Sequence, residues 1–258
     1  MTYTSSHTGV LLVAHGTRDE FGLSEVHTLS AAVAGALAPW PIETGFIELA
    51  TPTIGGAFDR LVKRGAQEVR IVPLLLFAAG HAKADLPRAI RDAAAIHKSV
   101  EITVAPPFGL DERIAALSRR RFAEAVCGRP HVATDETYWL LVGRGSSDRE
   151  ATKEFGQFAR EQARRLGIVQ FACSFVAAAA PSLEEGLTCA VKLAGEGMKR
   201  IVVQPHLLFR GVVLDEVCAE VARWQTKCPA VDWVICAHLG PEQELVDAVI
   251  ARATATST

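Results

Sequence analysis

The chain has 258 residues, of which 49% are hydrophobic and 22% are charged, and its formal net charge is −2. This composition is sufficient for an ordinary buried core, and the near-neutral charge argues against electrostatic attraction to nucleic acid or membrane. No stretch has the length and apolar character of a transmembrane helix, and the first nine residues lack the features of a signal peptide. We therefore expect a cytoplasmic protein with no nucleic-acid or membrane partner.

Short apolar runs alternate with amphipathic segments along the whole chain. In the first half we expect strands at 9–14, 42–48, 68–76 and 100–105, and helices at 20–37, 52–64, 84–97 and 111–126. In the second half we expect strands at 138–142, 169–177, 199–207 and 231–237, and helices at 148–166, 181–195, 213–226 and 241–252. This alternation predicts an α/β fold with right-handed βαβ units and a parallel sheet in each half.

Boundary signals divide the chain further. For the second helix, Thr51 can cap the start, Pro52 suits the first turn and Gly65 suits the exit. The segment 128–136 is rich in polar residues and helix breakers, which indicates a linker. We therefore expect an N-terminal domain at 1–128 that carries the active site and a C-terminal domain at 137–258.

The sequence also repeats itself at a nearly constant spacing. LVAHGTRD, ending at Asp19, matches LVGRGSSD, ending at Asp148. Further along, ATPT matches AAPS, and VRIVPLLLF matches RIVVQPHLLF. Three ordered matches indicate an internal duplication, so the C-terminal domain is interpreted as a degenerate repeat of the first. Such a duplication can replace a dimer of half-length subunits, which leaves both a monomer and a homodimer open.

The two halves differ where ionisable side chains follow the strands. The aligned pairs are His15 with Arg144, Glu48 with Ala177, and His81 with Val212 or Val213. Ligands of open parallel sheets gather at the carboxyl ends of the strands, so we expect both histidines to face one crevice. Because only the first half has these ionisable side chains, we expect one active site, and the other half would supply a wall of the crevice and charges that bind the substrate.

His15 and His81 are candidates for metal handling. An imidazole binds divalent first-row metals and accepts protons near neutral pH, and with Glu48 the set would leave coordination positions open. The simpler alternatives are that each histidine is a hydrogen-bonded turn residue and that Glu48 caps the helix near Pro52. Two histidines at matched strand ends favour the metal-handling interpretation.

Basic side chains next to these turns can pair with substrate carboxylates. The candidates are Arg18, Lys83, Arg144 and Arg210. A minor contribution from His206 or His238, near strand ends of the second half, stays open. The glycine turns lack both the G-x-G-x-x-G spacing and the P-loop lysine, which argues against a nucleotide site.

In combination, LVAHGTRD around His15, FIELATPT around Glu48 and VPLLLFAAGHAKADLP around His81 resemble the class II chelatases of the CbiX and SirB type, which act on sirohydrochlorin. The matching motifs cover most of the first half. The resemblance implies a chelatase-like fold, with two similar α/β domains facing a central cleft. It also implies insertion of Fe²⁺ or Co²⁺, with Ni²⁺ a further option, into sirohydrochlorin for sirohaem or cobalamin synthesis. No organic cofactor is implied.

Carried over to this sequence, the resemblance implies that His15 and His81 bind the metal and remove the pyrrole protons, assisted by Glu48. The chain lacks the histidine-rich stretch and clustered cysteines of some longer cobalt-type members, which favours iron while leaving cobalt open. Two alternatives use the same residues. A non-catalytic carrier would take up metal or tetrapyrrole without turnover, and a phosphate-binding regulatory domain would show nucleotide affinity without metal dependence.

Overall fold

A computed structural model describes residues 7–77 and 81–255, and for residues 81–83 it describes the backbone alone. Every strand and helix expected from the sequence is present within a few residues of its predicted bounds. The predicted linker contains a short 3-10 helix, η1 (Thr134–Glu136). None of the described helices combines the length and the apolar composition needed to cross a bilayer.

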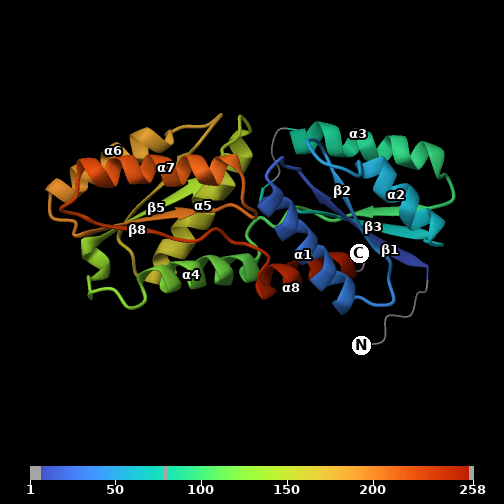
Figure 1. Ribbon diagram of the computed structural model, residues 1–258, viewed down its shortest axis with the longest axis horizontal. Coiled ribbons are helices and arrows are strands. Elements are labelled where there is room, and N and C mark those ends of the chain that lie inside the picture. Colours follow the sequence, from blue (N-terminus) through green and yellow to red (C-terminus); the bar gives the residue numbers. More distant parts are fainter. Residues whose placement is uncertain (1–6, 78–80, 256–258) are drawn as a thin grey trace. The chain divides into compact units, whose positions relative to one another are not determined.

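The repeated halves have the same order of elements (Figure 1). The first half contains β1 (Thr8–Ala14), α1 (Glu20–Ala36), β2 (Ile42–Phe46), α2 (Ile54–Lys63), β3 (Glu68–Pro73), α3 (His81–Ile96), β4 (Glu101–Val104) and α4 (Glu112–Val126). The second half contains β5 (Thr137–Gly143), α5 (Arg149–Leu166), β6 (Gln170–Phe175), α6 (Leu183–Gly195), β7 (Arg200–Pro205), α7 (Val212–Lys227), β8 (Asp232–Ile235) and α8 (Gln243–Thr254).

Each half forms a four-stranded parallel sheet, in the orders β2-β1-β3-β4 and β6-β5-β7-β8. The central strand β1 is buried along its whole length, because helices cover both faces of the sheet. Its residue Val13 pairs with Gly45 on one side and with Pro73 on the other. The strand order reverses next to β1, and ligands of open α/β sheets bind at such a point, outside the carboxyl ends of the strands.

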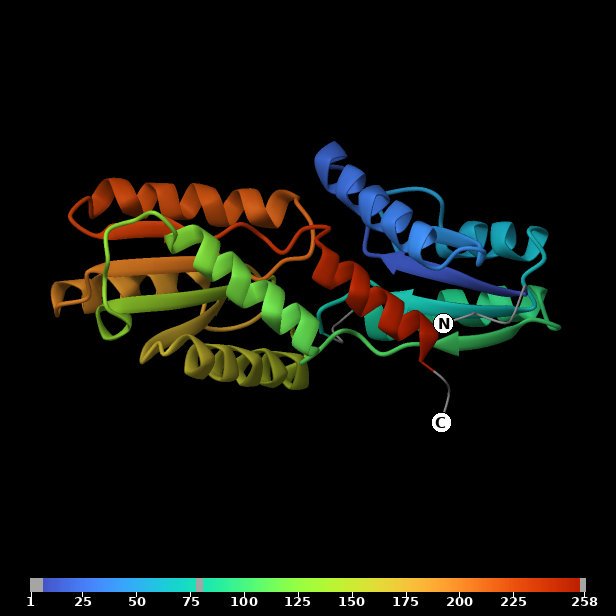
Figure 2. The same ribbon diagram turned by 90° about the horizontal axis from the view of Figure 1, so that it is seen from below.

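The chain divides into two compact units that do not coincide with the repeated halves. The first unit comprises Met1–Phe108 and Pro241–Thr258, and the second comprises Gly109–Gly240. In the first unit, α2 and α3 pack on one face of the sheet, while α8 packs against α1 and β3 (Figures 1 and 2). In the second unit, α6 and α7 cover one face, and α4 packs against α5 and β8. The last helix of each half therefore completes the unit built from the other half, whereas the expected domains at 1–128 and 137–258 follow the duplication.

A buried polar network holds α4 in the second unit. Gln204 of β7 is fully buried, and its amide donates to the carbonyl and hydroxyl oxygens of Ser118 at 2.8 and 3.0 Å. The indole of Trp139 on β5 donates to the Gln204 side-chain oxygen at 2.9 Å. Buried polar groups are costly unless they are paired, so this network ties the position of α4 to the sheet.

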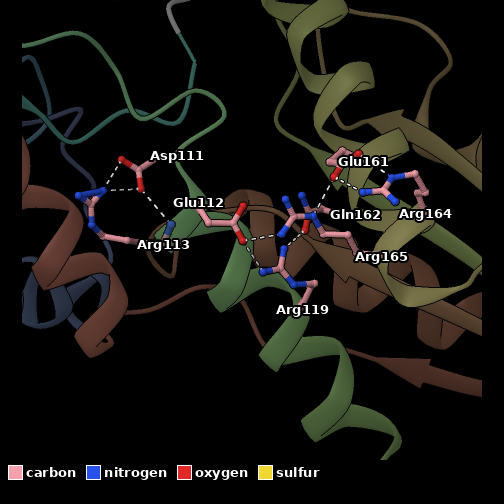
Figure 3. A network of polar contacts seen from close by, with 8 residues as sticks. All are labelled: Asp111, Glu112, Arg113, Arg119, Glu161, Gln162, Arg164 and Arg165. Atoms are coloured by element: carbon pink, nitrogen blue, oxygen red, sulfur yellow. Dashed lines mark hydrogen bonds and ion pairs between the residues drawn. The ribbon is translucent and has the colours of Figure 1, made fainter.

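Exposed ion pairs continue this contact between α4 and α5 (Figure 3). Glu112 accepts from Arg119 at 2.6 Å and from Arg165 at 2.8 Å, and Arg119 also donates to Gln162. In the first unit, an arginine side chain holds the end of α8. Arg70 of β3 donates to the carbonyl oxygen of Ala253 at 2.9 Å, so a charged side chain pairs with a carbonyl group at the end of the helix.

The start of α2 differs from the prediction. Thr53, and not Thr51, is the N-cap, because its hydroxyl accepts from the Gly56 amide at 3.2 Å. The carbonyl oxygen of Pro52 instead accepts from the Phe46 amide, so this segment still runs beside β2. The exit is as predicted, since Gly65 follows the helix with a positive φ of 91°.

Candidate functional site

The loop after β1 is shaped by local hydrogen bonds that place His15 at the edge of the sheet. The Thr17 hydroxyl accepts from the Asp19 amide at 3.0 Å, and the Asp19 carboxylate accepts from the Gly22 amide at 2.6 Å, which caps α1. Gly16 has a φ of +99°, a conformation that glycine adopts without steric cost. The strand therefore turns sharply directly after His15.

The segment after β2 is locked against this loop. The Glu48 amide donates to the carbonyl oxygen of His15 at 3.0 Å. A β-carbon on Gly16 would lie 1.8 Å from the carbonyl oxygen of Glu48, so only glycine allows this approach. As a result, His15 Nδ1 lies 3.5 Å from Glu48 Oε1, with exposed fractions of 25% for the histidine side chain and 50% for the glutamate.

This pair has the chemistry of a weak metal ligand set. A carboxylate next to Nδ1 favours the tautomer with its proton on Nδ1, which places the acceptor lone pair on Nε2, the ring nitrogen that can bind a metal or accept a proton. Partial exposure lets solvent and ligands reach both groups. Because Thr53 caps α2, the alternative interpretation of Glu48 as the cap of that helix is wrong.

The side chains of His81 and Lys83 lie outside the described residues, so the expected meeting of two imidazoles is a prediction without a test here. The backbone of α3 begins at His81, after strand β3, which pairs directly with β1. Among the side chains that are described, no group of three histidine, cysteine, aspartate or glutamate residues is arranged to hold a metal ion.

The other basic candidates occupy exposed loop positions. Arg18 is exposed, and within the described part of the chain no hydrogen bond or ion pair is assigned to its guanidinium. Arg144 is exposed in the second unit at the position that corresponds to His15. Arg210 is exposed too, but its guanidinium lies 4.0 Å from the carboxylate of Asp215. Arg18 and Arg144 are therefore the better placed to receive a new anionic partner.

The corresponding loop of the second unit has the same backbone geometry but lacks the histidine and the glutamate. Its Ser146 hydroxyl accepts from the Asp148 amide at 3.0 Å, as Thr17 does for Asp19, and Gly145 has a φ of +93°. A β-carbon on Gly145 would lie 1.8 Å from the carbonyl oxygen of Ala177. The backbone frame is thus duplicated, but alanine stands where the first unit has Glu48.

His206, left open as a contributor, is a core residue. It is 2% exposed and packs against Phe158 and Phe155, with ring centroids 4.5 and 5.7 Å away. Burial lowers the pKa of His206 to about 3, because the charged form is poorly solvated there. A neutral, enclosed imidazole cannot contact a substrate at the edge of the sheet.

Sequence reasoning missed a groove of about 470 Å³ beside Glu48. It lies between the end of β2, the start of α2 and one face of α3. Its charged lining residues are Glu48, Asp59, Asp85, Arg88 and Asp92. The sequence feature that could have indicated this groove is the spacing of Asp85 and Asp92, which are seven residues apart and so lie on one face of a helix. The excess of carboxylates makes the groove acidic.

Known proteins resemble this chain over most of its length. The family model CbiX matches residues 9–125 and again residues 139–256. The sirohydrochlorin ferrochelatase of Priestia megaterium is 32% identical over 231 residues, covering 90% of this chain and 84% of that protein. The sirohydrochlorin cobaltochelatase of the same organism is 28% identical over 250 residues, covering 95% and 78%.

A solved structure supports the same assignment. SirB from Bacillus subtilis with Fe³⁺ superposes with a TM-score of 0.82 at 28% identity, covering 95% of this chain and 93% of that one. The double match of one family model also agrees with the internal duplication found in the sequence. Together with the two parallel sheets, these similarities show that the chain belongs to the CbiX family.

Proposed function

We propose that this chain is a sirohydrochlorin chelatase, a lyase-type enzyme that inserts Fe²⁺ or Co²⁺ into sirohydrochlorin for sirohaem or cobalamin synthesis. The observation that carries the proposal is the pairing of His15 with Glu48 at 3.5 Å on the ligand-binding edge of a CbiX-type sheet. The similar ferrochelatase and cobaltochelatase of Priestia megaterium support both metals as substrates.

The reaction requires the metal to leave its ligands and two pyrrole N–H protons to leave the macrocycle. His15 binds the incoming ion through Nε2, while Glu48 keeps the imidazole oriented from the Nδ1 side. A site with few protein ligands releases its ion more readily than a closed structural site. The same imidazole then accepts a proton as the pyrrole nitrogens replace it on the metal. His81 is proposed as the second metal ligand and base.

The acidic side chains of sirohydrochlorin need cationic partners. Arg18, Lys83, Arg144 and Arg210 are proposed to supply them, since guanidinium groups form bidentate hydrogen bonds with carboxylates. Arg144 takes the position of His15 in the duplicated fold. This substitution converts an equivalent loop from metal binding to anion binding, which is consistent with a single active site in the first unit.

The proposal is tested by incubating the protein with sirohydrochlorin and Fe²⁺, Co²⁺ or Ni²⁺, and following the absorbance change of the macrocycle. An enzyme produces many metallated macrocycles per protein molecule. Uptake limited to one equivalent would identify a carrier instead. Nucleotide binding that persists after chelator treatment, without any metallation, would favour the regulatory alternative.

A further inference from the structure

The residue that follows Glu48 has an unusual backbone. Leu49 has a φ of +60°, and the Ala50 amide donates to the Glu48 carbonyl oxygen at 2.8 Å. These features define a γ-turn with positive φ at its central residue, which is the rarer and more strained form. A bulky residue seldom adopts this conformation, and its side chain is also apolar and 51% exposed.

The turn cannot relax independently of the site. The Glu48 carbonyl oxygen that closes the γ-turn also lies against Gly16, where a β-carbon would approach it to 1.8 Å. The Glu48 amide is hydrogen-bonded to His15 on the other side. The direction of the Leu49 side chain is therefore fixed by the same backbone contacts that bring His15 to Glu48.

The duplicated unit separates the role of the backbone from that of the side chain. Ala178 corresponds to Leu49 and has nearly the same φ, +55°, so the conformation belongs to the shared fold. Ala178 is also exposed, yet it carries only a methyl group. Both units thus have the strained backbone at this position, but only the unit with His15 and Glu48 exposes a leucine there. The other unit has alanine, the smallest chiral side chain.

We infer that Leu49 is a substrate-binding residue that packs against the apolar ring face of the tetrapyrrole and holds it over His15 and Glu48. The inference rests on the proposed function. A flat macrocycle offers an apolar face with charged arms at its rim, and a rigidly held aliphatic side chain next to the metal-binding pair complements that face. A fixed contact also limits the loss of side-chain entropy on binding.

The test compares Leu49→Ala, Leu49→Gly and Leu49→Met, with Ala178→Gly as the matched control in the second unit. Kd for sirohydrochlorin is measured without metal from the change in macrocycle absorbance, and KM is measured for each substrate. We expect Leu49→Ala and Leu49→Gly to weaken sirohydrochlorin binding about tenfold and leave KM for the metal unchanged. Leu49→Met should keep most of the affinity, and Ala178→Gly should bind like the wild type.

Thermal unfolding separates this role from a structural one. Glycine accepts a positive φ without strain, so Leu49→Gly should unfold no earlier than the wild type even though it binds sirohydrochlorin poorly. Wild-type affinity in Leu49→Ala and Leu49→Gly would overturn the inference and leave the proposed function standing. A wild-type protein that neither binds nor metallates sirohydrochlorin would overturn both.

Discussion

Replacing Gly16 with alanine tests whether backbone packing sets the geometry of the site. The new β-carbon would lie 1.8 Å from the Glu48 carbonyl oxygen, far inside van der Waals contact, and Gly16 has a φ of +99°. Carbon and oxygen atoms that are not bonded normally lie about 3.2 Å or more apart. The backbone of either His15 or Glu48 must therefore move by roughly 1 Å or more. The 3.5 Å separation of His15 and Glu48 cannot survive that movement.

The expected loss of stability has two parts. The left-handed backbone costs an alanine about 1–2 kcal/mol, and relief of the overlap adds about 1–3 kcal/mol. Gly145→Ala provides a matched comparison, because its β-carbon would also lie 1.8 Å from a carbonyl oxygen, that of Ala177. Gly35→Ala is a benign control, since no atom of the described residues beyond its own stretch of helix lies within 4 Å of the new β-carbon, and alanine favours a helix by about 1 kcal/mol.

Urea unfolding and metallation kinetics should be measured on the three variants. We expect Gly16→Ala and Gly145→Ala to lose similar amounts of stability, while only Gly16→Ala loses kcat. Gly145→Ala should act mainly on KM for sirohydrochlorin, through Arg144. Gly35→Ala should be as active as the wild type. If Gly16→Ala were destabilised but kept its kcat, the geometry of the His15–Glu48 pair would not matter for the reaction.

Three further predictions concern the second unit. Burial lowers the pKa of His206 to about 3, so as the pH falls below about 6.5 this histidine is protonated in the unfolded chain but not in the folded one. Stability should therefore drop by about 2 kcal/mol from pH 8 to pH 5. His206→Leu, which copies Leu74 of the first unit, should remove that part of the pH dependence in urea titrations; the same change of stability with pH in this variant would contradict the prediction. Gln204→Leu should cost about 1–3 kcal/mol by leaving buried groups unpaired, and Ser118→Ala less. Equal costs for the two would argue against the network. Arg144→Ala should raise KM for sirohydrochlorin and leave kcat nearly unchanged, and a loss confined to kcat would refute an anion-binding role.

The sequence was sufficient for the architecture because the hydrophobic runs and the duplication are strong, redundant signals. It also predicted that His15 and Glu48 would lie near one another, since both follow parallel strands and such strands end at a common edge. Thr53 rather than Thr51 became the helix cap because the chain continues alongside β2 for two more residues. Local propensity does not encode that continuation.

The exchange of α4 and α8 between the units could not be predicted from chain order. An amphipathic helix carries no mark of which of two similar sheets it covers. Gln204 was the available signal, because a glutamine within the apolar run of β7 requires a buried partner, and Ser118 of α4 provides it. His206 misled in the opposite direction, since a histidine near a strand end resembles a site residue until its burial is known.

The most direct test of the central claim is the rate of sirohydrochlorin metallation by the wild type and by His15→Ala, followed by macrocycle absorbance under excess substrate. The wild type should complete many turnovers. His15→Ala should keep its fold by circular dichroism and lose activity about 100-fold or more, because one group supplies both a metal ligand and a proton acceptor. Metallation by His15→Ala at the wild-type rate would contradict the account.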